Sequence, residues 1–176
     1  MAGHSKWKQI KEKKGKTDAM KSKIFGKFAR LITVEAKKAG GNLSAPNLKA
    51  VIERARKENT PNDIIERAIK KATESGGQAM ESITYESYGP GGVAIIIEAL
   101  TDSRNKAAQE IKHILSEQGF SLAAQGSASW AFKKTGGIWE PTMTVPLSDT
   151  DLELLGALTG KLEENDEVQE VFTNAE

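Results

Sequence analysis

Residues Ile83–Leu100, ITYESYGPGGVAIIIEAL, decide the fold class of this chain. The first part, Ile83–Tyr88, predicts a strand because its side chains follow a period of two instead of the helical period. Gly89-Pro90-Gly91-Gly92 then forces a turn. Val93–Leu100 is a continuous apolar run with a single charge, which is typical of a buried central strand. The stretch therefore predicts two strands joined by a tight turn.

Downstream of this stretch, helices and strands alternate. From Val93 the predicted order is β-α-β-β-α-β, which is the ferredoxin-like split βαβ arrangement with one extra strand before it. The predicted elements are a helix capped by Asp102 or Ser103 and ended by Gly119, two strands within Phe120–Phe132 bent near Gly126, a strand at Thr142–Leu147, a helix capped by Ser148, and a strand at Val168–Thr173. Residues 79–176 are therefore expected to form a ferredoxin-like α+β domain.

Upstream of the linker Ser75–Gln78, apolar residues recur every three or four positions, which is the helical period. The pattern predicts three helices: Asp18–Ala39 capped by Thr17 or Asp18, Pro46–Asn59 capped by Ser44, and one beginning at Pro61 with Thr60 as its N-cap. The first should turn Met20, Ile24, Phe28, Leu31 and Ile32 inward. Residues 1–16 are polar and lysine-rich, so we expect an extended or poorly ordered arm. Residues 1–74 thus predict a basic helical domain with an arm, and the whole chain an α+β protein.

The charge of the chain is unevenly distributed. The formal net charge is +1, from 25 Lys+Arg and 24 Asp+Glu in 176 residues. Residues 1–71 hold 19 basic and 7 acidic residues, whereas residues 72–176 hold 6 basic and 17 acidic residues. Such an asymmetry points to a nucleic acid or another anionic partner. Two plainer explanations stay open: the lysine-rich faces are merely solvated, or the two halves neutralise each other across an interface.

A basic stripe follows the first predicted helix. At 100° per residue, Lys23, Lys27, Arg30 and Lys37 fall within an arc of about 80°. Because lysine predominates over arginine, contact with a phosphate backbone is favoured over bidentate reading of bases. His4 and Trp7 could stack on unpaired bases. Trp7 could equally be an anchor in the helical core.

Several classes of function find no support in the sequence. The chain has no cysteine, which excludes disulfides, Cys-ligated zinc and thiol catalysis. It has no apolar run of 18 residues and no secretory signal, so we expect a cytoplasmic protein with no membrane partner. No HExxH, GxSxG or P-loop motif occurs, and His113 is expected to be an ordinary surface residue. We therefore expect a monomer that is not an enzyme and binds no cofactor or metal, although a ferredoxin-like scaffold alone excludes no activity.

Two loops could bind an anion. The glycine-rich turn at Tyr88–Gly92 could present backbone N–H groups to a phosphate, but a tight connection is favoured because the turn opens no helix. Asp102–Asn105 lies where a strand ends and a helix begins, which is a natural anion site. A helix cap with an Arg–Asp pair is the favoured interpretation there.

Motifs along nearly the whole chain resemble the YebC/TACO1 family. They are Met1–Trp7 (MAGHSKW), Ile10-Lys11, Lys13-Lys14, Lys23–Phe25 with Lys27 and Arg30, Asn59–Pro61 with Ile65–Ile69, Tyr85-Glu86, Tyr88–Gly92, Thr101-Asp102 with Arg104–Lys106, Gly126-Ser127, Leu162-Glu163 and Asp166–Val171 with Asn174. Family members usually carry a further α/β domain between the strands that end near Gly137 and begin near Pro141. Here Gly136–Trp139 joins the two directly, so the resemblance implies that this third domain is missing.

The resemblance implies a non-enzymatic translation factor that associates with the ribosome and binds ribosomal RNA and tRNA. Bacterial members of the family are thought to relieve stalling at proline-rich stretches, and a mitochondrial relative activates translation. A DNA-binding transcriptional regulator is the alternative, although no helix with Arg, Asn and Gln at base-reading positions stands out. The residues expected to bind nucleic acid are Gly3, His4, Ser5, Lys6, Trp7, Lys11, Lys13, Lys14, Lys23, Lys27 and Arg30.

Overall fold

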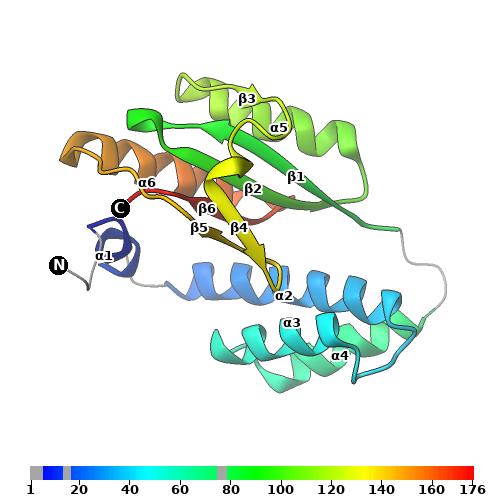
Figure 1. Cartoon of the computed structure of the whole chain (residues 1–176). Helices are drawn as coiled ribbons and strands as arrows, with labels where there is room; N and C mark the ends of the chain where they lie inside the picture. Colours follow the sequence, from blue (N-terminus) through cyan, green and yellow to red (C-terminus); the bar gives the residue numbers. More distant parts are fainter. Residues whose placement is uncertain (1–5, 14–16, 75–78) are drawn as a thin grey trace. The chain divides into compact units, whose positions relative to one another are not determined.

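A computed structural model describes residues 6–13, 17–74 and 79–176 (Figure 1). The described chain forms two compact units. The α+β unit combines helix α1 (Lys6–Lys13) with residues 81–176, and the helical unit lies within residues 16–80. The expected α+β class is confirmed. The boundary differs from the expected one, because α1 belongs to the α+β unit and not to the helical unit.

The four-stranded sheet of the α+β unit has the order β3-β1-β2-β6. Its centre is the hairpin of β1 (Glu81–Tyr88) and β2 (Ala94–Thr101), which pair antiparallel along their full length, from Glu81↔Thr101 to Tyr88↔Ala94. The short β3 (Leu122–Ala123) pairs with the outer edge of β1, and β6 (Val168–Thr173) pairs with β2. The two strands predicted from Ile83–Leu100 are therefore both present and lie in the middle of the sheet.

The position of the extra strand is where the sheet departs from the expected β-α-β-β-α-β arrangement. Because β1 is antiparallel to both β2 and β3, these two strands are parallel to each other and are joined through helix α5 (Arg104–Glu117). This is a split βαβ unit with β1 between its two strands. The extra strand thus occupies the sheet centre, and the next strand, β4 (Phe132–Thr135), lies outside the sheet. The tight turn between β1 and β2 explains the central position of β1, because it makes the two strands neighbours in the sheet.

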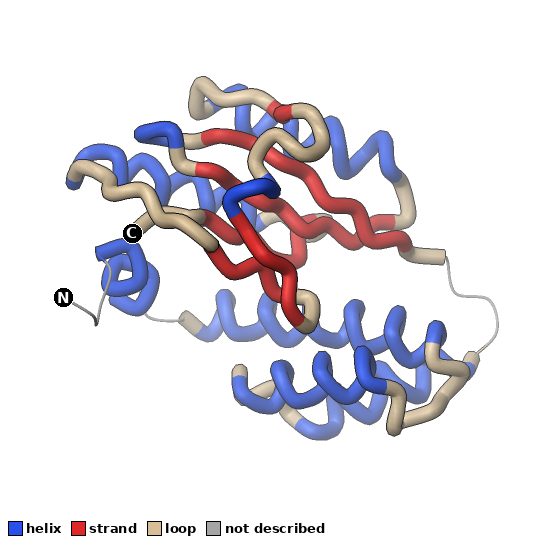
Figure 2. The backbone as a smooth tube through the Cα atoms, in the orientation of Figure 1, coloured by secondary structure: helices blue, strands red, loops and turns tan. Residues whose placement is uncertain are grey.

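Both faces of β2 are covered, as its continuous apolar sequence predicts (Figure 2). One face carries Val93, Ile95, Ile97 and Ala99 into a cluster with α5 and helix α6 (Asp149–Glu164). The opposite face carries Ala94 and Ile96 into a second cluster. That cluster is completed by Ala128, Ala131 and Phe132, with Trp139 and Phe172 packed against it.

Strands β4 and β5 (Ile138–Pro141) form a separate two-stranded hairpin. Thr135 pairs with Ile138, so the connection is the two residues Gly136-Gly137 at φ 58° and 82°. Positive φ at both positions is what a type I′ hairpin turn requires. The direct join is therefore a plain hairpin, as expected. The predicted strand Thr142–Leu147 is wrong: within it only Val145 makes an isolated bridge, to Ala175. Val145 exchanges backbone hydrogen bonds with Asn174 and Glu176, which lie beyond the end of β6 at Thr173, so no ladder forms along the strand itself.

The turn between β1 and β2 is a tight connection. Residues Pro90–Gly92 form one turn of 3-10 helix, η1, and Gly89 N–H donates to Val93 O at 2.8 Å. Gly91 has a φ of 69° and lies against α6. The carboxylate of Asp151 lies 3.1 Å from where a Gly91 side chain would begin, so a negative charge already faces this turn.

We expect Gly91→Ala to lower the free energy of unfolding by about 2–3 kcal/mol. The new Cβ would stand in the left-handed region and would also meet Leu147 Cδ2. Gly92→Ala is the matched control, because Gly92 also has a positive φ but open space around it. The free energy of unfolding of Gly92→Ala should fall by only about 1 kcal/mol. Urea unfolding checks both, and equal losses would show that the steric contact is unimportant.

The helical unit contains α2 (Asp18–Lys38), α3 (Pro46–Lys57) and α4 (Asn62–Thr73), close to the predicted ranges. Its core is formed by the buried residues Ile32, Ala36, Leu48, Val51, Ile52, Ala55, Ile65 and Ala68. Phe28 and Leu31 pack against this core as expected, whereas Met20 is 44% exposed, so its expected inward position is wrong.

The predicted helix caps are confirmed at some positions and wrong at others. Thr17 caps α2 by accepting from Met20 N–H at 3.2 Å, and Ser103 and Ser148 cap α5 and α6 in the same way. The predicted caps Ser44 and Thr60 are wrong. Helix α3 begins at Pro46 as predicted, but the residue before it is Ala45, and α4 begins at Asn62, one residue later than expected. Ala45 and Pro61 are the N-caps, and neither can accept through its side chain.

Candidate nucleic-acid interface

The basic side of α2 is the strongest candidate interface in the helical unit. Lys23, Lys27 and Arg30 follow one another at spacings of four and three, so they share a face of the helix. Ile32 and Ala36 face the core of the unit on the opposite side. Lys23 is exposed, and Lys27 and Arg30 are half-buried. The core packing of α2 thus fixes the direction in which its basic side faces.

Other cations extend the positive charge over the helical unit. Residues 16–80 hold 14 Lys+Arg and 7 Asp+Glu, a net of +7. Arg54 of α3 lies over the Phe28 ring at 5.9 Å, and burial lowers the pKa of its guanidinium from the ordinary value. The exposed cations of α3 and α4 are Lys49, Arg56, Lys57, Arg67, Lys70 and Lys71. The charge of this unit is spread over all three helices, which suits an extended polyanion.

The remaining residues, 1–15 and 81–176, hold 11 Lys+Arg and 17 Asp+Glu, a net of −6. The polarity expected from the sequence is therefore real but smaller, because the N-terminal lysines belong to the acidic unit. Lys6 Nζ lies 3.0 Å from Asp149 Oδ1, and Lys11 Nζ lies 3.8 Å from Glu163 Oε1. Both pairs are exposed, and such pairs contribute at most about 1 kcal/mol. A phosphate could therefore replace either carboxylate at little cost.

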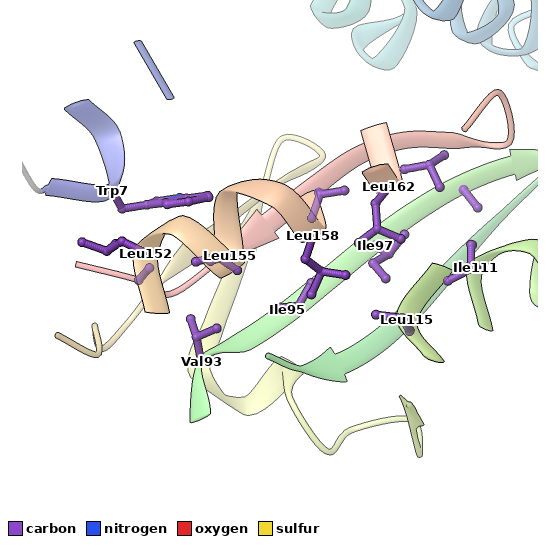
Figure 3. Packing of buried hydrophobic residues seen from close by; sticks show 14 residues of the cluster. Trp7, Val93, Ile95, Ile97, Ile111, Leu115, Leu152, Leu155, Leu158 and Leu162 are labelled. Carbon is purple, nitrogen blue, oxygen red and sulfur yellow. The ribbon is translucent and has the colours of Figure 1, made fainter. Parts of the chain in front are cut away.

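Helix α1 corrects the expectation of an extended arm. Trp7 is 7% exposed and belongs to the main core of the α+β unit. Its ring reaches over α6 toward Leu152 and Leu155 (Figure 3), and its backbone N–H donates to Glu176 O at 3.2 Å. Trp7 is an anchor, but in the α+β core and not in the helical core, and its indole is not available to stack on a base here. The amphipathic pairing of Trp7 with Ile10, three positions apart, is the signal that could have revealed this helix.

Several of the residues expected to bind nucleic acid are not described by the structure. Gly3, His4, Ser5 and Lys14 lie outside the described residues. Lys13 is the last residue of α1, and its side chain lies outside the described part of the chain. Of the expected residues that the structure describes, Lys6, Trp7 and Lys11 lie on the α+β unit, and Lys23, Lys27 and Arg30 lie on the helical unit.

A buried carboxylate that the sequence did not single out holds one loop of the α+β unit. Glu86 of β1 accepts hydrogen bonds from the backbone N–H groups of Gly126 at 2.6 Å, Ala128 at 2.9 Å and Ser129 at 2.6 Å. Burial raises the pKa of Glu86, but these hydrogen bonds together bring the pKa below its ordinary value. Glu86 and Gly126 both lie in motifs that carry the family resemblance, and this contact joins the two motifs in space.

The second possible anion site is occupied by the protein's own groups. Ser103 caps α5 by accepting from Lys106 N–H at 3.3 Å, which confirms the cap. Arg104 Nε lies 2.8 Å from Glu81 Oε1, so its partner is Glu81 and not the expected Asp102. The ion pair ties the start of α5 to the start of β1.

Nothing in the described residues suggests a metal centre. No group of three or more His, Cys, Asp or Glu side chains in residues 6–13, 17–74 and 79–176 could hold a metal ion. His113 Nε2 lies 2.8 Å from Glu117 Oε1 on the exposed face of α5, where a surface role was expected. None of the helices in this same part of the chain is long and apolar enough to cross a bilayer.

The fold and its charges define a two-unit α+β protein with a basic helical unit and an acidic sheet unit. Residues 5–75 match the family model described as "TACO1/YebC protein N-terminal domain". Residues 80–139 match the model described as "TACO1/YebC second and third domain". The chain belongs to the TACO1/YebC family.

The relatives carry the name "Probable transcriptional regulatory protein". The one from Fervidobacterium nodosum is 38% identical over 235 aligned positions, which cover 99% of this chain and 93% of that protein. The one from Petrotoga mobilis is 44% identical, and the alignment covers 100% of this chain and 71% of that protein. The one from Thermotoga maritima is 51% identical, with 78% of this chain and 55% of that protein covered. A crystal structure of a conserved hypothetical protein from Aquifex aeolicus matches with a TM-score of 0.77 and 29% identity. The match covers 90% of this chain and 91% of that one.

The alignments also bear on the third domain. The 235 positions aligned with the Fervidobacterium protein exceed the 176 residues of this chain, so at least 59 of them have no counterpart here. The match to the second and third domain ends at residue 139, inside β5. This is where the family resemblance predicts the inserted domain, and the structure has a two-residue hairpin turn just before it.

Proposed function

We propose that this protein is a non-enzymatic regulator of gene expression that binds nucleic acid through the basic side of α2. The observation that carries the proposal is the series Lys23, Lys27 and Arg30 on one face of a helix whose other face is fixed in a core. Cations held at this spacing release counterions from a phosphate backbone, which supplies affinity without base specificity.

Ribosomal RNA and tRNA are the ligands that we assign first, which makes the protein a translation factor. Lysine supplies most of the positive charge of the helical unit, and a lysine-rich surface suits the backbone of structured RNA better than the reading of base edges. The mechanism is one of positioning: the binding energy favours a productive geometry of a stalled peptidyl-tRNA, such as one at a proline-rich stretch, without a covalent step.

Duplex DNA is the second candidate ligand. The specific observation in its favour is the name of the relatives, each called a probable transcriptional regulatory protein. None of the described helices carries the Arg, Asn and Gln series with which a recognition helix reads the major groove. Under this alternative the same lysines would contact DNA phosphates.

The experiment is a triple charge reversal, Lys23→Glu/Lys27→Glu/Arg30→Glu, measured by ribosome co-sedimentation. We expect affinity to fall about 100-fold near physiological salt and the salt dependence to weaken by two to three contacts. The matched control, Lys57→Glu/Lys70→Glu/Lys71→Glu, makes the same charge change on α3 and α4 and should lose much less. Undiminished sedimentation of the α2 variant would refute the assignment of α2. Tight, sequence-dependent binding of duplex DNA in a parallel titration would establish the second candidate instead.

A further inference from the structure

We propose that Tyr88 and Trp130 form a stacking platform on the α+β unit for an unpaired base of a single-stranded nucleic acid. The inference rests on the proposed function and names a second point of contact, of a different chemistry from the basic side of α2. None of the residues expected to bind nucleic acid belongs to it.

The two aromatic side chains are exposed and joined to each other. Tyr88 ends β1 and is 36% exposed, and Trp130 lies in the 3-10 turn η2 (Ser129–Ala131) and is 59% exposed. Trp130 Nε1 donates to the Tyr88 hydroxyl oxygen at 3.0 Å, and the Tyr88 hydroxyl donates to Ser127 O. Their polar groups are thus satisfied within the protein, and what remains for a ligand is the aromatic surface.

The loop beneath Trp130 is held in place. Glu86 accepts from the N–H groups of Gly126, Ala128 and Ser129, and Ala128 and Ala131 are buried in the second core cluster. A single exposed apolar residue is common on protein surfaces and needs no explanation. An exposed indole fixed by a hydrogen bond on a clamped loop is different, because little conformational entropy remains to be lost when a ligand stacks on it.

Two cations near Trp130 in the sequence favour a nucleic acid over a peptide. Lys133 and Lys134 come three and four residues after Trp130, although residues 81–176 hold only 6 basic residues in all. Lys134 Nζ lies 5.2 Å from the centre of the Trp139 ring. Lys133 is exposed and opposes Glu140 in the hairpin register, but it makes no ion pair in the described part of the chain. An ammonium beside an exposed aromatic pair can hold the phosphate of the nucleotide whose base is stacked.

The chemistry of the platform predicts what it binds. Because the single polar hydrogen of each side chain is already donated within the protein, the rings are left to bind by stacking, and the platform should accept any base. Stacking requires a base that is not paired in a duplex, so loops, ends and single strands are the ligands that fit.

The test compares Trp130→Ala with the wild-type full chain in binding a 12-nucleotide oligouridine and a 12-base-pair RNA duplex. We expect affinity for the single strand to fall about 10-fold and affinity for the duplex to stay unchanged. Trp130→Phe keeps a ring but not the hydrogen bond and should retain most of the binding, which separates stacking from misfolding. Leu154→Ala is the matched control, because Leu154 is a 47% exposed apolar residue on α6.

Tryptophan fluorescence gives an independent signal. Trp7 is buried and Trp139 donates to Glu98 Oε1 at 2.7 Å, so quenching by oligouridine should come from Trp130 and disappear in Trp130→Ala. Unchanged single-strand binding by Trp130→Ala, with binding still lost on charge reversal of α2, would overturn the platform and leave the proposed function standing. Absence of binding to every nucleic acid would overturn both. Quenching by a proline-rich peptide but not by oligouridine would make this a peptide site and overturn the inference.

Discussion

Glu86→Ala is expected to lower the free energy of unfolding of the α+β unit by about 3 kcal/mol or more. The substitution leaves the N–H groups of Gly126, Ala128 and Ser129 without their shared acceptor, in a loop whose residues Ala128 and Ala131 are buried. Denaturant unfolding followed by tryptophan fluorescence measures the loss. This signal reports on the α+β unit alone, because Trp7, Trp130 and Trp139 all belong to it.

Glu81→Ala is the matched control on the same strand. Glu81 makes an exposed ion pair with Arg104, and its loss should change stability by less than about 1 kcal/mol. If the two variants unfold at the same denaturant concentration, Glu86 does not hold the loop.

The same carboxylate should make the stability of the α+β unit depend on pH. The pKa of Glu86 is lower in the folded protein than in the unfolded chain, so its contribution is complete above the ordinary glutamate pKa of about 4.3. As the pH falls below that value and through the folded pKa, the contribution is lost. The difference in stability between the wild type and Glu86→Gln should therefore shrink as the pH falls below about 4.

Trp7→Ala is expected to destabilise the α+β unit by about 3–5 kcal/mol, the usual cost of truncating a buried aromatic side chain. Trp7 packs in the same core as Leu152 and Leu155 of α6, and Ile10 packs against that core. Unfolding of the variant is followed by the fluorescence of Trp139. Trp130→Ala removes the same side chain at an exposed position and should change stability little. A Trp7→Ala variant as stable as the wild type would mean that α1 is the loose arm that the sequence predicts.

The elements that the sequence predicts well have a local signal. The β1–β2 hairpin follows from the Gly89–Gly92 turn between two apolar strands, and the three helices of the helical unit follow from their period. The position of β1 between β2 and β3 has no local signal, because it depends on which strand pairs with the free edge of β1. The predicted strand at Thr142–Leu147 also depends on distant pairing: an extended stretch becomes a strand only if it pairs with a partner over several residues, and here the pairing is confined to the bridge at Val145.

The candidate interface was predictable only in part. The basic side of α2 follows from residue spacing, because one helix carries all of its residues. The burial of Trp7 in the α+β core was not predictable, because a lysine-rich helix of eight residues is barely stable alone and forms through contacts with α6, more than 140 residues away. Glu86 was not singled out because its function lies in three backbone N–H groups of a distant loop, and no side-chain pattern encodes such groups.

The contact of α1 with α6 has a consequence for the order in which the chain is made. Trp7 is synthesised 145 residues before Leu152 and 169 residues before Glu176, whose carbonyl accepts from its backbone N–H. At the usual rates of synthesis, roughly 10 to 30 s pass between the two. The helical unit, encoded in between, can fold during that interval, but the α+β unit has to wait for its final segment. A nascent chain of this protein therefore carries an unburied indole until α6 has been made, and it becomes resistant to proteolysis in two separate stages.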